Sequence, residues 1–136
     1  MLRIDRIVGA LRGASLKHQG VAFSLFTEDG SCLAASDESE QTQTIGAAVA
    51  SIFIEFRAAE SVSPTALQSL VYRTERRLVC GQQIATLSDG MVVLLIVSAR
   101  SDVADVSYLQ KITARACEDL AVLKDTLAGM TKRFNE

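Results

Sequence analysis

Two Asp-Gly pairs, each set between apolar runs, constrain the fold of this 136-residue chain more than any other feature. The first lies in Glu28-Asp29-Gly30 and the second in Leu87-Ser88-Asp89-Gly90. Because Asp-Gly supplies the positive φ that tight hairpin turns require, each pair predicts two antiparallel strands. The four strands predicted in this way are Val21–Thr27, Ser31–Ser36, Leu78–Thr86 and Met91–Ser98.

The remaining segments predict one more strand and three helices. Apolar residues spaced by threes and fours indicate a helix from Leu2 to Ala14, a second from about Thr44 to Ala59, and a third over about 103–131. Leu67–Thr74 is the fifth predicted strand. The order α-ββ-α-βββ-α predicts an α+β fold with one antiparallel sheet, in a single domain spanning 1–136.

One strand is predicted to lie at the centre of this sheet. Met91–Val97 is apolar throughout and does not alternate, which indicates burial on both faces. The three helices can provide this cover, two on one face and one on the other.

The second helix is apolar on two opposite faces. A rotation of about 100° per residue places one set of apolar side chains toward the sheet: Ile45, Ala48, Val49, Ile52, Phe53 and Phe56. The opposite face is predicted to carry Ala47, Ala50, Ile54 and Ala58. Since a helix buried on both sides needs cover on both, this second face predicts a dimer interface. The alternative is that the alanines serve helix propensity and Ile54 is an isolated exposed side chain.

The composition agrees with a folded, partner-binding chain. Hydrophobic residues make up 49% of it, which excludes disorder and exceeds what a small monomer needs. A net charge of −2 argues against nucleic-acid binding. Cys32, Cys80 and Cys117 are odd in number and widely spaced, as is typical of reduced thiols in the cytoplasm. No apolar run approaches the roughly 20 residues that a membrane span needs.

Catalytic chemistry is not indicated. The single histidine, His18, follows a predicted helix, and no cysteine pair has the spacing of zinc ligands. Phosphate-binding loops and nucleophile-elbow motifs are absent from the sequence. We therefore expect no enzyme activity, no catalytic residue, no metal and no cofactor.

A group of arginines is the remaining charged feature. Arg73, Arg76 and Arg77 lie around the turn between the third and fourth predicted strands. A solvated hairpin tip explains them adequately. The functional alternative is a basic rim that faces an acidic patch on a partner.

The whole pattern resembles the roadblock (dynein light-chain) superfamily. Besides the element order, the resemblance rests on Gly20-Val21, on Glu28–Ser36 around the first hairpin, and on Ile45–Ser51 in the second helix. Within the superfamily, the chain is most similar to the roadblock subunit of the Ragulator complex. The resemblance implies a five-stranded antiparallel sheet and pairing through the second helices and third strands. It adds Leu70, Val71 and Tyr72 to the expected interface.

The family also implies a function. Its members are scaffolds without cofactors that pair with a second roadblock-domain protein, as homodimers or heterodimers, and dock small GTPases. A Ragulator-like protein would be cytoplasmic and recruited by a lipidated partner to late endosomal and lysosomal membranes for MAPK and TOR signalling. Two alternatives are a dynein light chain for cargo transport and a regulator of GTPase nucleotide turnover. In the regulator, Arg76 or Arg77 would be presented to the nucleotide.

Overall fold

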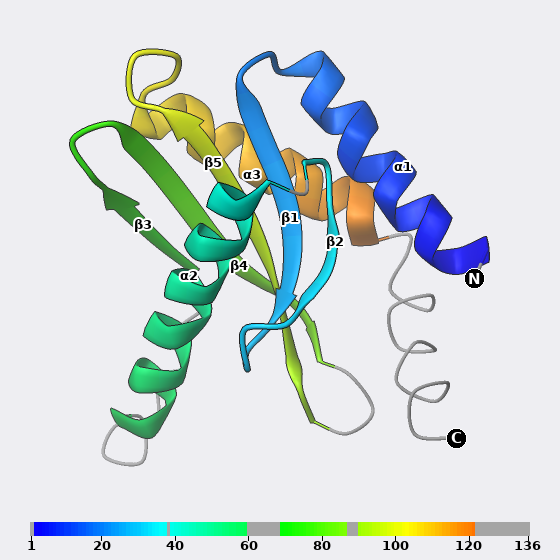
Figure 1. The fold of residues 1–136 in the computed structure, drawn as a ribbon, viewed down its shortest axis with the longest axis vertical. Helices are drawn as coiled ribbons and strands as arrows, with labels where there is room; N and C mark the ends of the chain where they lie inside the picture. The colour runs from blue at the N-terminus through cyan, green and yellow to red at the C-terminus, as the bar shows by residue number, and fades with distance from the viewer. Residues whose placement is uncertain (1, 38, 60–68, 87–89, 122–136) are drawn as a thin grey trace.

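The computed structural model describes residues 2–37, 39–59, 69–86 and 90–121, which form eight elements in the predicted α-ββ-α-βββ-α order (Figure 1). They are α1 (Leu2–Lys17), β1 (Val21–Thr27), β2 (Cys32–Ala35), α2 (Glu40–Ala59), β3 (Ser69–Arg73), β4 (Arg77–Thr86), β5 (Val92–Arg100) and α3 (Val106–Ala121). Of the C-terminal helix predicted over about 103–131, the part after residue 121 lies outside the described residues, as do residues 67 and 68 of the fifth predicted strand.

The five strands form one antiparallel sheet in the order β2-β1-β5-β4-β3. Ile96 of β5 lies between Ser24 of β1 and Gly81 of β4, so β5 is the central strand. Eight of its nine residues are buried, because helices cover both sides of it. The prediction from the apolar run Met91–Val97 is confirmed.

The first hairpin turn has the predicted Asp-Gly chemistry. Gly30 has φ = 92°, and the Gly30 amide donates to the Thr27 carbonyl over 3.0 Å. The Asp29 carboxylate accepts hydrogen bonds from the Thr27 hydroxyl and from the Ser31 amide, and these bonds lower its pKa. Gly90, at the end of the second predicted turn, has φ = 88°.

Alternate side chains of the strands point into two separate cores. On β1, Leu25 packs with α1 and α3, whereas Phe26 packs with α2. We call the first the two-helix core; Leu11, Leu25, Leu95 and Leu109 are among its members. We call the second the one-helix core; Phe26, Val49, Phe53, Leu94 and Ile96 are among its members. The helices therefore lie two on one face and one on the other, as expected.

The second helix begins four residues before the predicted Thr44. Ser39 caps it, because its hydroxyl accepts a hydrogen bond from the Thr42 amide over 3.2 Å. The acidic and polar composition of the preceding stretch hides this start. The one local signal for it is Ser39 itself, a residue type that favours the cap position and that directly precedes Glu40.

Candidate interaction surface

The exposed side of α2 carries small and apolar side chains together with the polar Thr44 and the acidic Glu55. Ala47, Ala48, Ser51 and Ile54 are exposed in the single chain, and Ile54 retains 45% of its accessible surface. We call these four residues the α2 stripe. Lysine and arginine are absent from it, in contrast to an ordinary solvated helix face.

Ala50 does not belong to this surface, which corrects the sequence prediction. It has no exposed area and packs in the one-helix core, whereas Ala48, predicted to face the sheet, is exposed. Ala47 and Ile54 lie on the outer face as predicted, and the side chain of Ala58 lies outside the described residues.

Close contact at two glycines explains this rotation of the helix. A Cβ at Gly46 would lie 2.1 Å from the Phe26 ring, and a Cβ at Gly81 of β4 would lie 2.8 Å from Val49. The helix therefore approaches the sheet closely at Gly46, with Val49, Ala50 and Phe53 also facing inward. The periodicity of the sequence includes Ile45 and Ile52 in the buried face, whereas both are half-buried at its margin.

The strand β3 continues this surface at the edge of the sheet. It pairs with β4 on one side and with no other described strand on the other. Leu70 and Tyr72 are half-buried against the one-helix core, and Val71 is 36% exposed. Burial raises the pKa of the Tyr72 hydroxyl, and the nearby Arg77 opposes part of this rise. An apolar edge strand with unpaired backbone groups is a template for another chain.

The predicted arginines are only partly brought together. Arg76 and Arg77 line a polar pocket of about 450 Å³, whereas Arg73 is exposed at the end of β3 and does not line it. The Arg77 guanidinium donates to the Gln41 side-chain oxygen at the start of α2 over 2.6 Å. The side chain of Arg76 forms no hydrogen bond or ion pair with the part of the chain described here.

Sequence reasoning missed a third arginine in this pocket. Arg100 of β5 lies directly opposite Arg77 in the β4–β5 register and pairs with Asp102 over 2.7 Å. Two like charges opposite each other are unfavourable, and each of these arginines is held by a different neutral or acidic partner. The sequence carries no signal for this pairing, because the register shift between Gln83 and Ala85 decides which residue of β5 lies opposite Arg77.

The histidine and the cysteines of the described residues do not form a metal-binding group. No group of three His, Cys, Asp or Glu residues that could hold a metal ion occurs among the described residues. Burial raises the pKa of the Cys80 thiol and raises that of Cys117 to about 11, so neither is a thiolate at neutral pH. His18 contacts the Tyr108 hydroxyl over 3.2 Å and the Phe23 ring.

A membrane-spanning helix is likewise not found in the part of the chain described here: none of its helices is both long and apolar enough.

Comparison with known proteins identifies the fold. No protein-family model matches the chain, and no curated protein matches its sequence. Among solved structures, the gliding protein MglB from Thermus thermophilus has a TM-score of 0.71 and 19% identity, covering 90% of this chain and 91% of that one. MglB from Myxococcus xanthus has a TM-score of 0.70 and 10% identity, covering 91% of each chain. A roadblock/LC7 domain from Streptomyces avermitilis has a TM-score of 0.65 and 14% identity, covering 83% of this chain and 92% of that one.

The chain therefore has the α+β fold of the roadblock/LC7 domain, as the sequence resemblance implied. Its structural neighbours are MglB and roadblock/LC7 proteins. Nothing in these findings is specific to Ragulator, to dynein or to the lysosome.

Proposed function

We propose that this chain is a non-catalytic roadblock/LC7 protein that self-associates through α2 and β3 and regulates nucleotide turnover on a small GTPase. The observation that carries the proposal is the surface formed by the α2 stripe and the edge of β3. Both parts expose apolar side chains and lack a partner within the described chain, and Leu70 and Tyr72 of β3 pack against the one-helix core that α2 covers.

A second copy of the chain could pack against the α2 stripe and also hydrogen-bond to the edge of β3. The α2 stripe consists of small side chains and one isoleucine, so a second helix can approach it closely. The edge of β3 needs hydrogen bonds to its outer backbone groups, and a second β3 supplies them. A two-fold axis satisfies both needs with identical chains. One structure of an MglB is described as a tetrameric arrangement, which supports assembly in proteins of this fold.

Regulation of a GTPase is favoured over the scaffold role by two considerations. Two of the solved neighbours are MglB proteins, from Thermus thermophilus and Myxococcus xanthus, and the family that the sequence resembles includes bacterial regulators of GTPase turnover. The Ragulator-like role in late endosomal and lysosomal signalling and the dynein light-chain role gain no support from the structure.

Arg76 is the side chain best placed to act on a nucleotide. It is exposed and unpaired among the described residues, whereas Arg77 is held by Gln41. Two hydrogen bonds from Ser101 hold the turn that carries Arg76. The Ser101 amide donates to the Arg76 carbonyl over 2.9 Å, and the Ser101 hydroxyl donates to the Glu75 carbonyl over 3.3 Å. An exposed guanidinium on a hydrogen-bonded turn fits insertion toward developing charge on a phosphate.

The test uses the small GTPases that the tagged protein captures from its own cells. GTP hydrolysis and nucleotide exchange by each purified GTPase are measured with and without the protein. We expect the wild type to accelerate hydrolysis, and Arg76→Ala to lose at least about 100-fold of this acceleration while still binding, since arginine fingers contribute about 10³–10⁵.

Arg12→Ala is the matched control, because Arg12 is an exposed arginine on α1, far along the chain from this pocket. It should keep full activity. Unchanged hydrolysis and exchange with every captured GTPase would reject the proposed function. Loss of binding rather than turnover in Arg76→Ala would reject the role given to this arginine.

A further inference from the structure

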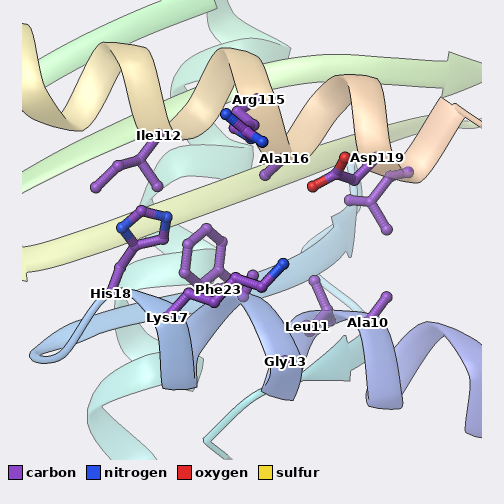
Figure 2. Close-up of a pocket in the computed structure, with 12 residues that line it drawn as sticks. Ala10, Leu11, Gly13, Lys17, His18, Phe23, Ile112, Arg115, Ala116 and Asp119 are labelled. Carbon is purple, nitrogen blue, oxygen red and sulfur yellow. The ribbon is translucent and has the colours of Figure 1, made fainter.

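A groove between α1 and α3, on the opposite side of the sheet from the α2 stripe, has the composition of a ligand site. Its volume is about 430 Å³, at the lower end of the range for small-molecule pockets. Figure 2 shows α1 as one wall, α3 as the other, and Phe23 of β1 between them. Apolar side chains form the floor, with Leu11 from α1 and Ile112 from α3 among them.

Small residues on α1 keep the groove open. Gly13 lines it, and a Cβ built on Gly13 meets no atom within 4 Å. Ala10 and Ala14 line the same wall. A methyl group at position 13 would therefore meet no other protein atom, which leaves room for a larger side chain to be tested there.

Two cations face the groove from opposite walls. Lys17 comes from the last turn of α1 and Arg115 from α3, and both are exposed (Figure 2). Neither forms an ion pair or a hydrogen bond with the described residues. Like charges on facing walls repel, and one anion held between them would remove this repulsion and accept hydrogen bonds from both.

The charge of the lining selects a monoanion. Asp119 is one helical turn beyond Arg115 and also lines the groove, so Lys17, Arg115 and Asp119 together carry a net charge of +1. A carboxylate matches this net charge, whereas a phosphate dianion would meet the Asp119 carboxylate with its second charge.

We propose that the groove between α1 and α3 binds a single-chain aliphatic carboxylate, with its head group between Lys17 and Arg115 and its chain on the apolar floor. The volume accommodates one chain rather than the two of a diacyl lipid. This site is independent of the proposed function, because it uses neither α2 nor β3.

Binding is tested by titration calorimetry with dodecanoate as the probe, and with dodecanol and dodecyl phosphate as comparison ligands. We expect dodecanoate to bind at least about tenfold more tightly than dodecanol, as the loss of charge-assisted hydrogen bonds requires. Dodecyl phosphate should bind more weakly than dodecanoate. Equal affinity for the alcohol, or tighter binding of the phosphate, would overturn the assignment of the head group.

Two glycine variants provide the decisive pair. Gly13→Leu fills the groove and should abolish dodecanoate binding. Gly9→Leu should bind like the wild type, because Gly9 also has open space around it but does not line the groove. Both replace a helical glycine with a better helix former, so neither loses the fold. Equal loss of binding in the two variants would contradict the proposal.

Charge variants test the head-group position in the same way. The double variant Lys17→Met with Arg115→Met should weaken dodecanoate binding at least about tenfold and leave dodecanol binding unchanged. Arg12→Met removes an exposed charge of α1 that does not line the groove, and its affinity should stay at the wild-type value. No binding of dodecanoate to the wild type would reject the site altogether and leave the groove to another occupant.

Discussion

The two faces of the sheet are covered by different numbers of the described helices. On one face, α1 and α3 cover the two-helix core, and Leu11, Leu95 and Leu109 have at most 1% of their surface exposed. On the other face, α2 covers the one-helix core by itself among the described helices, and Leu70 and Tyr72 at its margin stay half-exposed. The margin of the second face next to β3 is where we propose that a second chain packs.

The largest expected effect on the free energy of unfolding is the difference between replacing a fully buried leucine and replacing a half-buried one. Leu109→Ala removes a fully buried side chain from the two-helix core and should lower the free energy of unfolding by about 2–5 kcal/mol. Leu70→Ala, at the open margin, should cost less than half as much in dilute protein. Urea unfolding of both variants measures the difference. Equal losses would mean that β3 is as fully covered in the single chain as α3 is.

A second pair of variants compares glycines on the two faces. Gly46→Ala places a methyl group inside the Phe26 ring and should lower the free energy of unfolding by about 1–3 kcal/mol through overpacking. Gly13→Ala, on the side of α1 and α3, meets open space and should raise it by about 0.5–1 kcal/mol through helix propensity. The two changes therefore have opposite signs in the same urea experiment. A stabilising Gly46→Ala would show that α2 does not rest on Phe26.

The smallest expected effect is a pH dependence of stability that comes from Cys117 in the two-helix core. Burial raises the pKa of Cys117 to about 11, above its ordinary value near 9. The folded state therefore holds the neutral thiol, and this contribution to stability is present below pH 9 and lost as pH rises from 9 to 11.

Cys117→Ala should accordingly show a shallower loss of stability over this range than the wild type. Denaturant midpoints at pH 8, 9.5 and 11 measure the two slopes. Identical slopes would contradict the burial of this thiol.

The sequence predicts a structural element well where a single residue type or a simple pattern allows few alternative conformations. Gly30 and its Asp29 partner predict the first hairpin because the positive φ leaves few alternatives, and the apolar run in β5 predicts the centre of the sheet because burial on both faces removes alternation. The edge strand β3 was predicted to lie near residues 67–74, with its pairing taken from the family resemblance.

Tertiary contacts decide what the sequence did not predict. The rotation of α2 depends on Gly46 lying against Phe26, a contact between segments that periodicity treats separately. This contact turns Ala50 inward and Ala48 outward. The pocket at Arg76 is completed by Gln41 and Arg100, whose approach depends on the packing of α2 and on the β4–β5 register.

The mass of the purified protein in solution tests the central claim, that α2 and β3 form an interface between two copies of this chain. The chain has a mass of 14.6 kDa, and we expect light scattering to give twice this value for the wild type. Ile54→Glu places a charge in the α2 stripe and should give the mass of one chain, with an unchanged circular dichroism spectrum. Leu16→Glu is the control, because Leu16 is 86% exposed on α1, away from this surface, and it should remain a dimer. A wild-type mass of one chain, or a dimer that persists in Ile54→Glu, would contradict the account.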